Sequence, residues 1–269
     1  MFFSILMQVH AIINIFINVV YNEIKMKIIQ EFTNGRSGCY VALAVIDNQL
    51  GVYKSGIKNV DQYLLNSKSL PFKKPEIYSY TDTTLFMEYI PGISIKTYLD
   101  IATATDLDRL VDYISSYFDF CLNSSIENKD YSNVVLNKQL SINSICDVVT
   151  YNFNCLLPKS ITHGDFTFDN LIYYNNDFYM IDISPTDFDS IYFDANKLRQ
   201  DLTGLWFVRN YNNKANYQLS CNYIYNKLKQ KYSNVFNNEI YKFMLSRILP
   251  YCINHRKDYD FIMKEINRL

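Results

Sequence analysis

Hydrophobic and polar positions in the first third of the chain follow the short alternation that is typical of β-strands. Runs rich in β-branched and aromatic residues are separated by polar turns such as Asp47-Asn48-Gln49. Residues 58–69 instead place apolar side chains at helical spacing, which predicts one helix. The expected strands are KIIQEF (27–32), CYVALAVI (39–46), LGVYKSG (50–56), PEIYSY (75–80) and TLFMEYI (84–90). We therefore expect a small antiparallel sheet with one helix over residues 26–90.

Pro91-Gly92 ends this pattern, and beyond it most apolar residues recur at helical spacing. One exception is LIYY and FYMIDI, which flank Asn175-Asn176 and so predict a β-hairpin. The expected helical ranges are 94–123, 135–156, and nearly everything from 193 onward, with breaks near 210–214, 233–238 and 250. The pattern predicts an α+β chain of two lobes, with a β-rich lobe at 26–90 and a helical lobe with one embedded hairpin at 91–269.

Residues 1–25 stand apart from both lobes. The stretch is strongly apolar, but Gln8, His10, Asn14 and Asn18 interrupt it, which weakens a membrane-span interpretation. No basic residue precedes the apolar run and no A-x-A site follows it, so it is a poor signal peptide. We expect translation to start at Met26. The alternative is a real anchoring helix, and the protein is expected to contact a membrane only in that case.

Composition excludes several classes of protein. Apolar residues make up 49% and charged residues 20%, so the chain can bury a sizeable core and is not intrinsically disordered. The net charge of −1 gives no general attraction to nucleic acid, so no nucleic-acid partner is expected. The six cysteines form no C-x-x-C pair and only three histidines are present. Scattered single cysteines are typical of reduced core residues, which favours a cytoplasmic protein.

The small net charge hides a segregation along the chain. Residues 1–75 carry a net charge of +4, residues 76–208 carry −12, and residues 209–269 carry +7. Chance variation of helix surfaces is the plainer interpretation. The sharper one is an acidic middle that handles metal ions and a basic C-terminal region that meets something anionic.

A short polar segment contains the residue types that phosphoryl transfer requires. HGDFTFDN (163–170) is followed by the expected hairpin and then by Asp182. Phosphoryl transfer needs oxygen ligands for Mg²⁺ and one carboxylate that orients the attacking hydroxyl and accepts its proton. Because the hairpin returns Asp182 to the end where Asn170 enters it, we expect Asp165 to be the catalytic base and Asn170 and Asp182 to hold the metal. The alternative is a buried loop in which Asp165 and Asn170 only cap helices.

These residues resemble a known family. HGDFTFDN followed by MIDIS resembles the H-G-D-x-x-x-x-N and I-D-[FWP] signatures of the aminoglycoside phosphotransferase and choline kinase group. DFDSIYFDANKLRQDL is similar to the segment after the metal-binding Asp in phosphotransferases encoded among bacterial surface-polysaccharide genes, and FMEYIPG resembles the adenine-binding hinge. The resemblance covers about residues 85–207. It implies a bilobal protein-kinase-like fold, ATP or GTP with Mg²⁺ as cofactors, an Asp194 that braces the catalytic loop, and adenine contacts from Glu88, Tyr89 and Ile90.

The N-terminal lobe is expected to hold the nucleotide phosphates. Gly35, Arg36, Ser37 and Gly38 lie in a turn between two expected strands, where backbone N–H groups and a hydroxyl can approach phosphate. Lys54 lies on the third strand, where kinase-like folds place the lysine that pairs with the α- and β-phosphates. Each feature has a plainer interpretation, an ordinary hairpin turn and an exposed lysine at a strand end.

One position departs from the family pattern. The lysine usually pairs with a glutamate on the following helix, and residues 58–69 contain none. Asp61 and Gln62 are the candidates to replace it. The missing glutamate favours a second class of function, a pseudokinase-type binding or regulatory module without catalysis. The intact Asp165, Asn170 and Asp182 favour an enzyme.

The charge of the C-terminal helices bears on the acceptor. Aminoglycosides are polycations, whereas residues 209–269 carry a net charge of +7, with Lys227, Lys229 and Lys231 close together in the sequence. This favours a neutral or anionic small-molecule hydroxyl acceptor, such as a sugar or polysaccharide precursor, and argues against an aminoglycoside. The argument assumes that these charges face the acceptor.

Overall fold

The computed structural model describes residues 26–32, 38–146 and 152–269, which fall into two compact units. The first unit takes the described residues up to Val60 together with Pro75–Tyr89, and the second takes Asp61–Lys74 and Ile90–Leu269. From the sequence, residues 61–74 were expected in the N-terminal lobe. They belong instead to the second unit, because Leu70 is buried in its large hydrophobic core.

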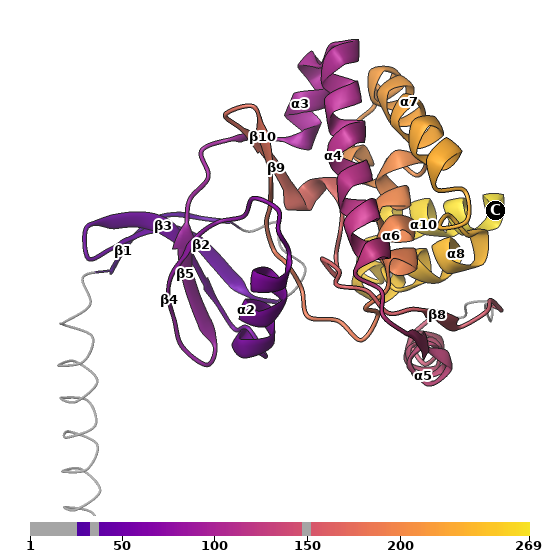
Figure 1. The fold of residues 1–269 in the computed structure, drawn as a ribbon, viewed down its shortest axis with the longest axis horizontal. Coiled ribbons are helices and arrows are strands. Elements are labelled where there is room, and N and C mark those ends of the chain that lie inside the picture. The colour runs from indigo at the N-terminus through magenta and orange to yellow at the C-terminus, as the bar shows by residue number, and fades with distance from the viewer. Residues whose placement is uncertain (1–25, 33–37, 147–151) are drawn as a thin grey trace, which may run out of the picture. The chain divides into compact units, whose positions relative to one another are not determined.

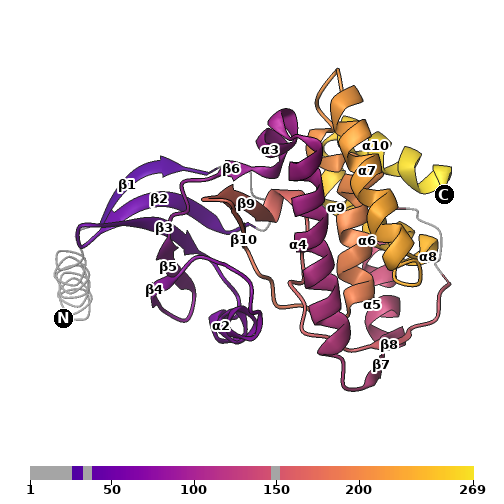
Figure 2. The same ribbon diagram turned by 45° about the horizontal axis from the view of Figure 1, so that its top comes forward.

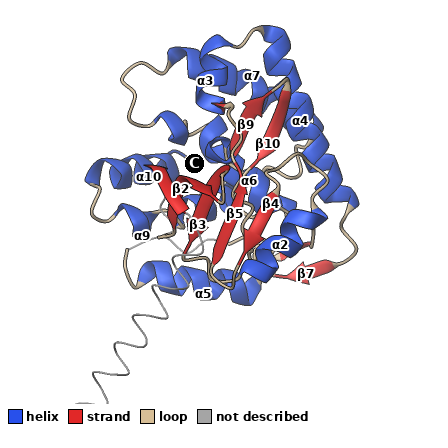
Figure 3. Cartoon of the chain, turned by 90° about the vertical axis from the view of Figure 1, so that its left-hand side faces the viewer, coloured by secondary structure: helices blue, strands red, loops and turns tan. Residues whose placement is uncertain are grey.

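The first unit is an antiparallel sheet of five strands, β1 (Met26–Glu31), β2 (Tyr40–Ile46), β3 (Gln49–Ser55), β4 (Ile77–Tyr80) and β5 (Thr84–Glu88). Their order is β1-β2-β3-β5-β4, and Figure 3 shows β3, β5 and β4 side by side. Ala42 and Ala44 are fully buried while their neighbours along β2 are partly exposed, as strand alternation requires. Asp47 and Asn48 both have positive φ, which gives β2 and β3 a two-residue type I′ turn.

The second unit contains the helices, which Figures 1 and 2 show from two directions. They are α2 (Val60–Ser69), α3 (Ile95–Ile101), α4 (Ala104–Asn123), α5 (Ser132–Asn143), α6 (Ile191–Leu202), α7 (Ala215–Lys231), α8 (Asn238–Ser246), α9 (Leu249–Cys252) and α10 (Arg256–Arg268). In both views α4 lies beside α7. A capping box of Thr103 and Asp106 fixes the start of α4.

One expected helix boundary was wrong. The helix expected over 135–156 ends at Asn143, and residues further on form the short strand β8 (Leu156–Pro158), which pairs with β7 (Asn128–Asp130). The expected break near 250 is present, because residues 247 and 248 separate α8 from α9, and Pro250 lies in the first turn of α9, where a helix needs no N–H donor. The chain leaves helical structure after it, at residues 253–255.

The expected hairpin consists of β9 (Leu171–Tyr174) and β10 (Asp177–Met180), and β6 (Ile93–Ser94) adds a third strand beside β9. Asn175 and Asn176 both have positive φ, which confirms the predicted turn. Gly92 allows the chain to approach β9, since a Cβ atom there would lie 2.5 Å from the carbonyl oxygen of Tyr173.

Helix α6 lies at the centre of the second unit and is buried along nearly its whole length. Its apolar residues join the large core together with Tyr117 and Phe118 of α4. Several polar residues of this helix are also buried, among them Asp194 and Asp201. Because buried polar groups need hydrogen-bond partners, these side chains are expected to hold neighbouring segments in place. In the described part of the chain, all six cysteines are free and no helix is long and apolar enough to cross a membrane.

Candidate active site

The loop that carries the HGDFTFDN motif is braced by a buried carboxylate of α6. The Asp194 Oδ2 atom accepts hydrogen bonds from the backbone N–H groups of His163 (3.0 Å) and Gly164 (3.1 Å), and from the Tyr117 hydroxyl (2.5 Å). Burial raises the pKa of Asp194, although His163 and these hydrogen bonds act in the opposite direction. Asp194 therefore has the bracing position that the sequence resemblance implied.

The fully buried His163 connects the loop at Asp165 to the segment that follows β10. Its Nε2 atom lies 2.9 Å from the Ile181 carbonyl oxygen, and the Asp165 N–H donates to its Nδ1 atom at 3.3 Å. Since Nδ1 accepts, Nε2 must carry the proton and donate to Ile181. The ring thus fixes Asp165 relative to the strand end before Asp182.

A second carboxylate of α6, which the sequence analysis missed, holds the other end of the loop. The Asp201 Oδ2 atom accepts from the Phe168 N–H at 2.8 Å. Burial, followed by the charge of Asp169, raises the pKa of Asp201 to about 8. The signal was present, because Asp194 and Asp201 lie seven residues apart and hence on the same side of a helix.

Asp165 is ionised and only partly covered, as a catalytic base must be. Its side chain is 42% exposed, and its Oδ1 atom lies 3.2 Å from the Lys197 Nζ atom. Burial favours the neutral acid, but Lys197, His163 and a hydrogen bond from Asn170 outweigh it and lower the pKa of Asp165. Lys197 was not singled out from the sequence, where it is one of several charged residues in FDANKLRQD.

Asn170 and Asp182 flank the two strands of the hairpin at the same end. Asn170 directly precedes β9, and the Ile181 N–H next to Asp182 donates to the Asn170 carbonyl oxygen at 3.0 Å. The Asn170 Nδ2 atom donates to Asp165, at 2.8 Å to its carbonyl oxygen and 3.1 Å to Oδ2, so the amide oxygen points away from Asp165. Asp182 has a φ of 57°, in the left-handed region that few non-glycine residues adopt.

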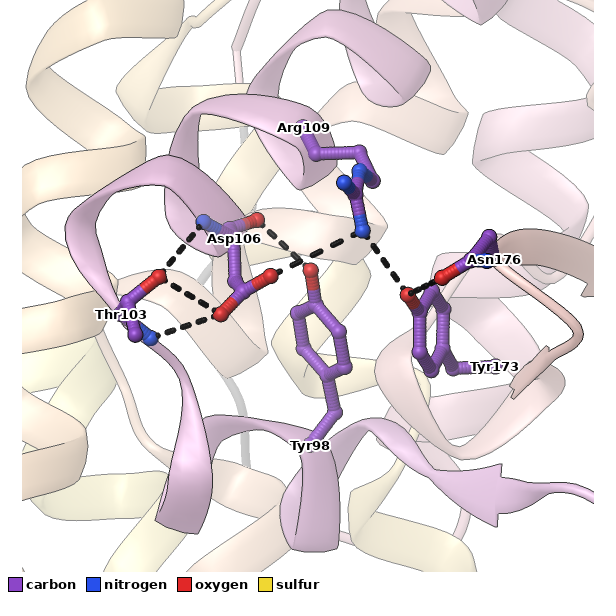
Figure 4. Close-up of polar contacts among 6 residues, drawn as sticks. All are labelled: Tyr98, Thr103, Asp106, Arg109, Tyr173 and Asn176. Atoms are coloured by element: carbon purple, nitrogen blue, oxygen red, sulfur yellow. Dashed lines mark hydrogen bonds and ion pairs between the residues drawn. The ribbon is translucent and has the colours of Figure 1, made fainter.

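The hairpin between these residues is fastened to the start of α4, as Figure 4 shows. The Arg109 Nη1 atom donates to the Tyr173 hydroxyl at 2.9 Å and lies 3.7 Å from the Asp106 carboxylate. The Tyr173 hydroxyl in turn donates to Asn176 in the hairpin turn at 3.1 Å. This exposed chain of polar contacts fixes the far end of the hairpin, whose near end carries Asn170.

Helix α2 carries both candidates to replace the absent glutamate, Asp61 and Gln62. The Gln62 Nε2 atom donates to Asn66 on the same helix at 2.8 Å, and Asp61 is exposed. Tyr63 is buried, and both burial and the negative charge of Asp182 raise its pKa. Among the second unit's own residues, α2 thus contributes an aromatic hydroxyl beside Asp182.

The candidate phosphate-binding residues lie only partly within the described residues. Gly35, Arg36 and Ser37 lie outside the described residues, and Gly38 has a φ of 73° with open space around its Cα. Lys54 lies on the third strand, as expected, paired in register with Val41 and Leu85.

The candidate hinge follows β5 directly. The Glu88 carboxylate accepts from the Glu76 N–H at 3.2 Å, while Tyr89 is partly exposed and Ile90 is buried. These contacts neither support nor oppose a role in adenine binding, which stays a prediction.

The C-terminal lysines that motivated the charge argument have other contacts. Lys231 forms an ion pair with Asp119 of α4 at 2.7 Å, and Lys227 and Lys229 lie over the rings of neighbouring tyrosines on their own helix. Among the cations near the loop, Lys197 lowers the pKa of Asp165, and the charge of Asp165 in turn acts to raise the pKa of Arg247 against the effect of burial. That the charge of residues 209–269 faces the acceptor stays a prediction.

No protein-family model and no curated protein match this sequence. Among solved structures, the gentamicin complex of APH(2'')-IIa is 14% identical with a TM-score of 0.53, and the match covers 91% of each chain. A thermostable mutant of aminoglycoside phosphotransferase APH(4)-Ia, in a ternary complex with ADP and hygromycin B, is 10% identical with a TM-score of 0.51, covering 94% of this chain and 96% of the other.

A third solved structure is amicoumacin kinase hAmiN in complex with AMP-PNP and Ca²⁺. It is 12% identical with a TM-score of 0.50, covering 89% of this chain and 88% of the other. At such identities the likeness establishes the fold and no more. The chain has the bilobal α+β, protein-kinase-like fold of the aminoglycoside phosphotransferases.

Proposed function

We propose that this protein is a phosphotransferase that moves the γ-phosphoryl group of ATP or GTP to a hydroxyl group of a small molecule. The acceptor is neutral or anionic, such as a sugar or polysaccharide precursor, and not an aminoglycoside. The reaction would take place in the cytoplasm, where nucleotide is abundant. The observation that carries the proposal is an ionised Asp165 hydrogen-bonded to Asn170 on a loop braced by buried carboxylates, with Asp182 at the end of the hairpin that Asn170 enters.

Asp165 is suited to be the catalytic base. Its lowered pKa keeps it ionised at neutral pH, and its partial exposure leaves an oxygen accessible to an acceptor hydroxyl. In the transfer, the acceptor oxygen forms a bond to the γ-phosphorus while the bond from phosphorus to the leaving nucleoside diphosphate breaks. The acceptor proton passes to the Asp165 carboxylate. Lys197 stabilises that carboxylate before the transfer.

Asn170 and Asp182 are suited to bind Mg²⁺. Amide and carboxylate oxygens are the ligands that this ion prefers, and the Asn170 amide is oriented by its donation to Asp165. No group of three or more His, Cys, Asp or Glu ligands occurs within the described residues. This fits an ion that also binds nucleotide phosphates and water. When bound, Mg²⁺ would neutralise charge on the transferring phosphoryl group.

For the nucleotide we propose Gly35, Arg36, Ser37, Gly38 and Lys54 at the phosphates, and Glu88, Tyr89 and Ile90 at the base. Lys54 on β3 is the part of this set that the fold supports best, because kinase-like folds use a lysine of this strand for the α- and β-phosphates.

A binding module without catalysis is the second candidate. It is favoured by the sequence of helix α2, which contains no glutamate to pair with the lysine. It would bind a nucleotide or a protein partner but transfer nothing. The ionised Asp165 argues against it, because a scaffold has no need of a base.

A transfer assay separates the two candidates. The protein is incubated with γ-labelled ATP or GTP, Mg²⁺ and a panel of neutral and acidic sugars, with kanamycin as a cationic comparison. We expect labelled product with at least one sugar and none with kanamycin. Turnover that persists fully in Asp165→Asn would refute the assigned base, and nucleotide binding without transfer to any hydroxyl would favour the binding module.

A further inference from the structure

Arg247 occupies an unusual position at the end of α8. Its guanidinium carbon lies 4.3 Å from the centre of the Phe188 ring, in the loop that follows Asp182, and its Nη1 atom donates to the Met244 sulfur at 3.3 Å. Sulfur is a weak acceptor, and guanidinium has five N–H donors. Among residues 26–32, 38–146 and 152–269, the Arg247 guanidinium makes no ion pair and no other hydrogen bond. A partly buried guanidinium without a carboxylate partner is costly unless an anion joins it.

The two aspartates whose charges act on Arg247 already have other partners. The charges of Asp165 and Asp194 both act on Arg247, which places the guanidinium in the surroundings of the catalytic loop. However, Asp165 pairs with Lys197, and Asp194 accepts three hydrogen bonds from the loop and Tyr117. Neither carboxylate lies within ion-pair distance of Arg247. Their field attracts the cation without neutralising it.

A second cation lies beside Arg247. Lys138 is on α5, three residues after Val135 and four before Ile142, so the three side chains share one side of the helix. Val135 packs in one core cluster with Phe188 and Met244, the two residues that Arg247 touches. Burial and the neighbouring charge of Arg247 lower the pKa of Lys138. Within the described residues, Lys138 also has no carboxylate partner.

We infer that Arg247 and Lys138 form an oxyanion subsite for the acceptor, so that the acceptor is an acidic small molecule with a carboxylate or phosphate group besides its reactive hydroxyl. This rests on the proposed function, in which that hydroxyl lies at Asp165. Two like charges held together repel each other, and an anion between them removes the repulsion. Arginine binds carboxylate and phosphate with two parallel hydrogen bonds, and lysine adds a point charge.

Lys242 on the same helix provides the contrast. It is also partly buried, but its Nζ atom lies 3.3 Å from the Glu239 carboxylate, so its charge is already compensated. A role of Arg247 confined to the C-terminal end of the helix dipole would stabilise α8 without affecting ligand binding. The two roles therefore predict different results for ligand affinity.

The test measures binding to the full chain by calorimetry in the absence of nucleotide. The probes are D-glucuronate, D-glucose 6-phosphate, D-glucose and inorganic phosphate. We expect at least one acidic sugar to bind about tenfold or more tightly than glucose, and Arg247→Gln and Lys138→Gln each to remove about tenfold or more of that affinity. Lys242→Gln should leave the affinity unchanged. The stronger of the two acidic sugars identifies the oxyanion as carboxylate or phosphate.

Several results would overturn the inference. Equal binding of glucose and both acidic sugars would do so, as would acidic-sugar or phosphate binding that is lost in Lys54→Gln but kept in Arg247→Gln, which would place the anion with the nucleotide. A fall in melting temperature of Arg247→Gln with unchanged affinity would indicate the purely structural role. Because no probe requires nucleotide, failure here is separate from failure of the phosphotransferase proposal, which the transfer assay decides.

Discussion

The loop that carries the HGDFTFDN motif and the sheet of the first unit are held in place by different kinds of hydrogen bond. In the loop, the conformation depends on a few buried side chains, since Asp194 and Asp201 accept from backbone N–H groups at its two ends. In the sheet, the strands are joined by a continuous backbone ladder, and β1 is exposed along its whole length. A loop without a ladder of its own needs side chains to satisfy its N–H groups.

This difference indicates where each unit is vulnerable. A single side-chain change in the loop removes several hydrogen bonds at once, whereas a single change in the sheet leaves most of the ladder intact. Proton transfer requires a base placed within hydrogen-bonding distance of the acceptor, so the loop should be sensitive in activity. The stability of the sheet should be sensitive mainly at positions where neighbouring strands and side chains leave no space for an added Cβ atom.

The largest expected effect is on the loop itself. Asp165→Asn removes the base but keeps the shape and the hydrogen-bonding oxygen, so the turnover number should fall by roughly 10²–10⁴-fold. Nucleotide affinity should stay the same, because Asp165 is not one of the proposed metal ligands. Steady-state kinetics and nucleotide titration measure the two quantities. Equal losses in both would show that the variant disrupts the loop rather than the proton transfer.

Replacing the brace should damage stability and activity together. Asp194→Ala leaves the His163 and Gly164 N–H groups and the Tyr117 hydroxyl without their shared acceptor. The free energy of unfolding should fall by roughly 2–5 kcal/mol, as expected for buried donors that lose an acceptor. Urea denaturation gives this value, and Asp194→Asn is the matched control with a smaller expected loss. Unchanged stability in Asp194→Ala would remove the basis for the comparison of the two units.

In the sheet, the sensitive position is Gly51 of β3. A Cβ atom there would lie 2.5 Å from the Met87 carbonyl oxygen and 2.6 Å from the Phe86 ring on the neighbouring β5. Gly51→Ala should therefore destabilise the protein by about 1–3 kcal/mol through overpacking. Since Lys54 lies on the same strand, the Michaelis constant for nucleotide should rise while the turnover number changes less. A loss confined to the turnover number would contradict the assignment of nucleotide binding to the sheet and proton transfer to the loop.

The smallest expected effect is a shift in pH dependence. Lys197 helps to lower the pKa of Asp165, and Lys197→Met removes that cation. The pKa of Asp165 should rise, so the carboxylate is protonated, and activity is lost, at a higher pH on the acid side of the profile. Lys197→Arg should keep the original acid limb. Profiles of turnover number against pH for the three proteins test this, and superimposable acid limbs would exclude Lys197 as a partner of the base.

Much of the second unit was predictable from sequence because its signals are local. Asn175-Asn176 specified the hairpin turn, and the hairpin brought Asn170 and Asp182 to one end. The partners on α6 and α8 were not predictable in the same way. Lys197 meets Asp165 across 32 residues, and Arg247 meets Phe188 across 59, so only the tertiary packing of helices brings these pairs together.

Tertiary packing also explains where the expectations from sequence fell short. The assignment of residues 61–74 to the first lobe followed chain order, whereas their place is decided by the burial of Leu70 in the core of the second unit. The charge of residues 209–269 was counted correctly, but the count did not show that Lys231 pairs with Asp119 while Arg247 forms no ion pair within the described residues. Net charge along a sequence does not say which charges are compensated.

The central claim is that Asp182 holds the metal while Asp165 serves only the acceptor. The most direct measurement is calorimetric titration of ATP and of GTP, with and without Mg²⁺, into the wild type, Asp165→Asn and Asp182→Asn. We expect Mg²⁺-dependent nucleotide binding in the wild type, the same affinity in Asp165→Asn, and loss of the Mg²⁺ dependence in Asp182→Asn. Identical Mg²⁺-dependent affinity in Asp182→Asn, or no binding of either nucleotide to the wild type, would contradict the claim.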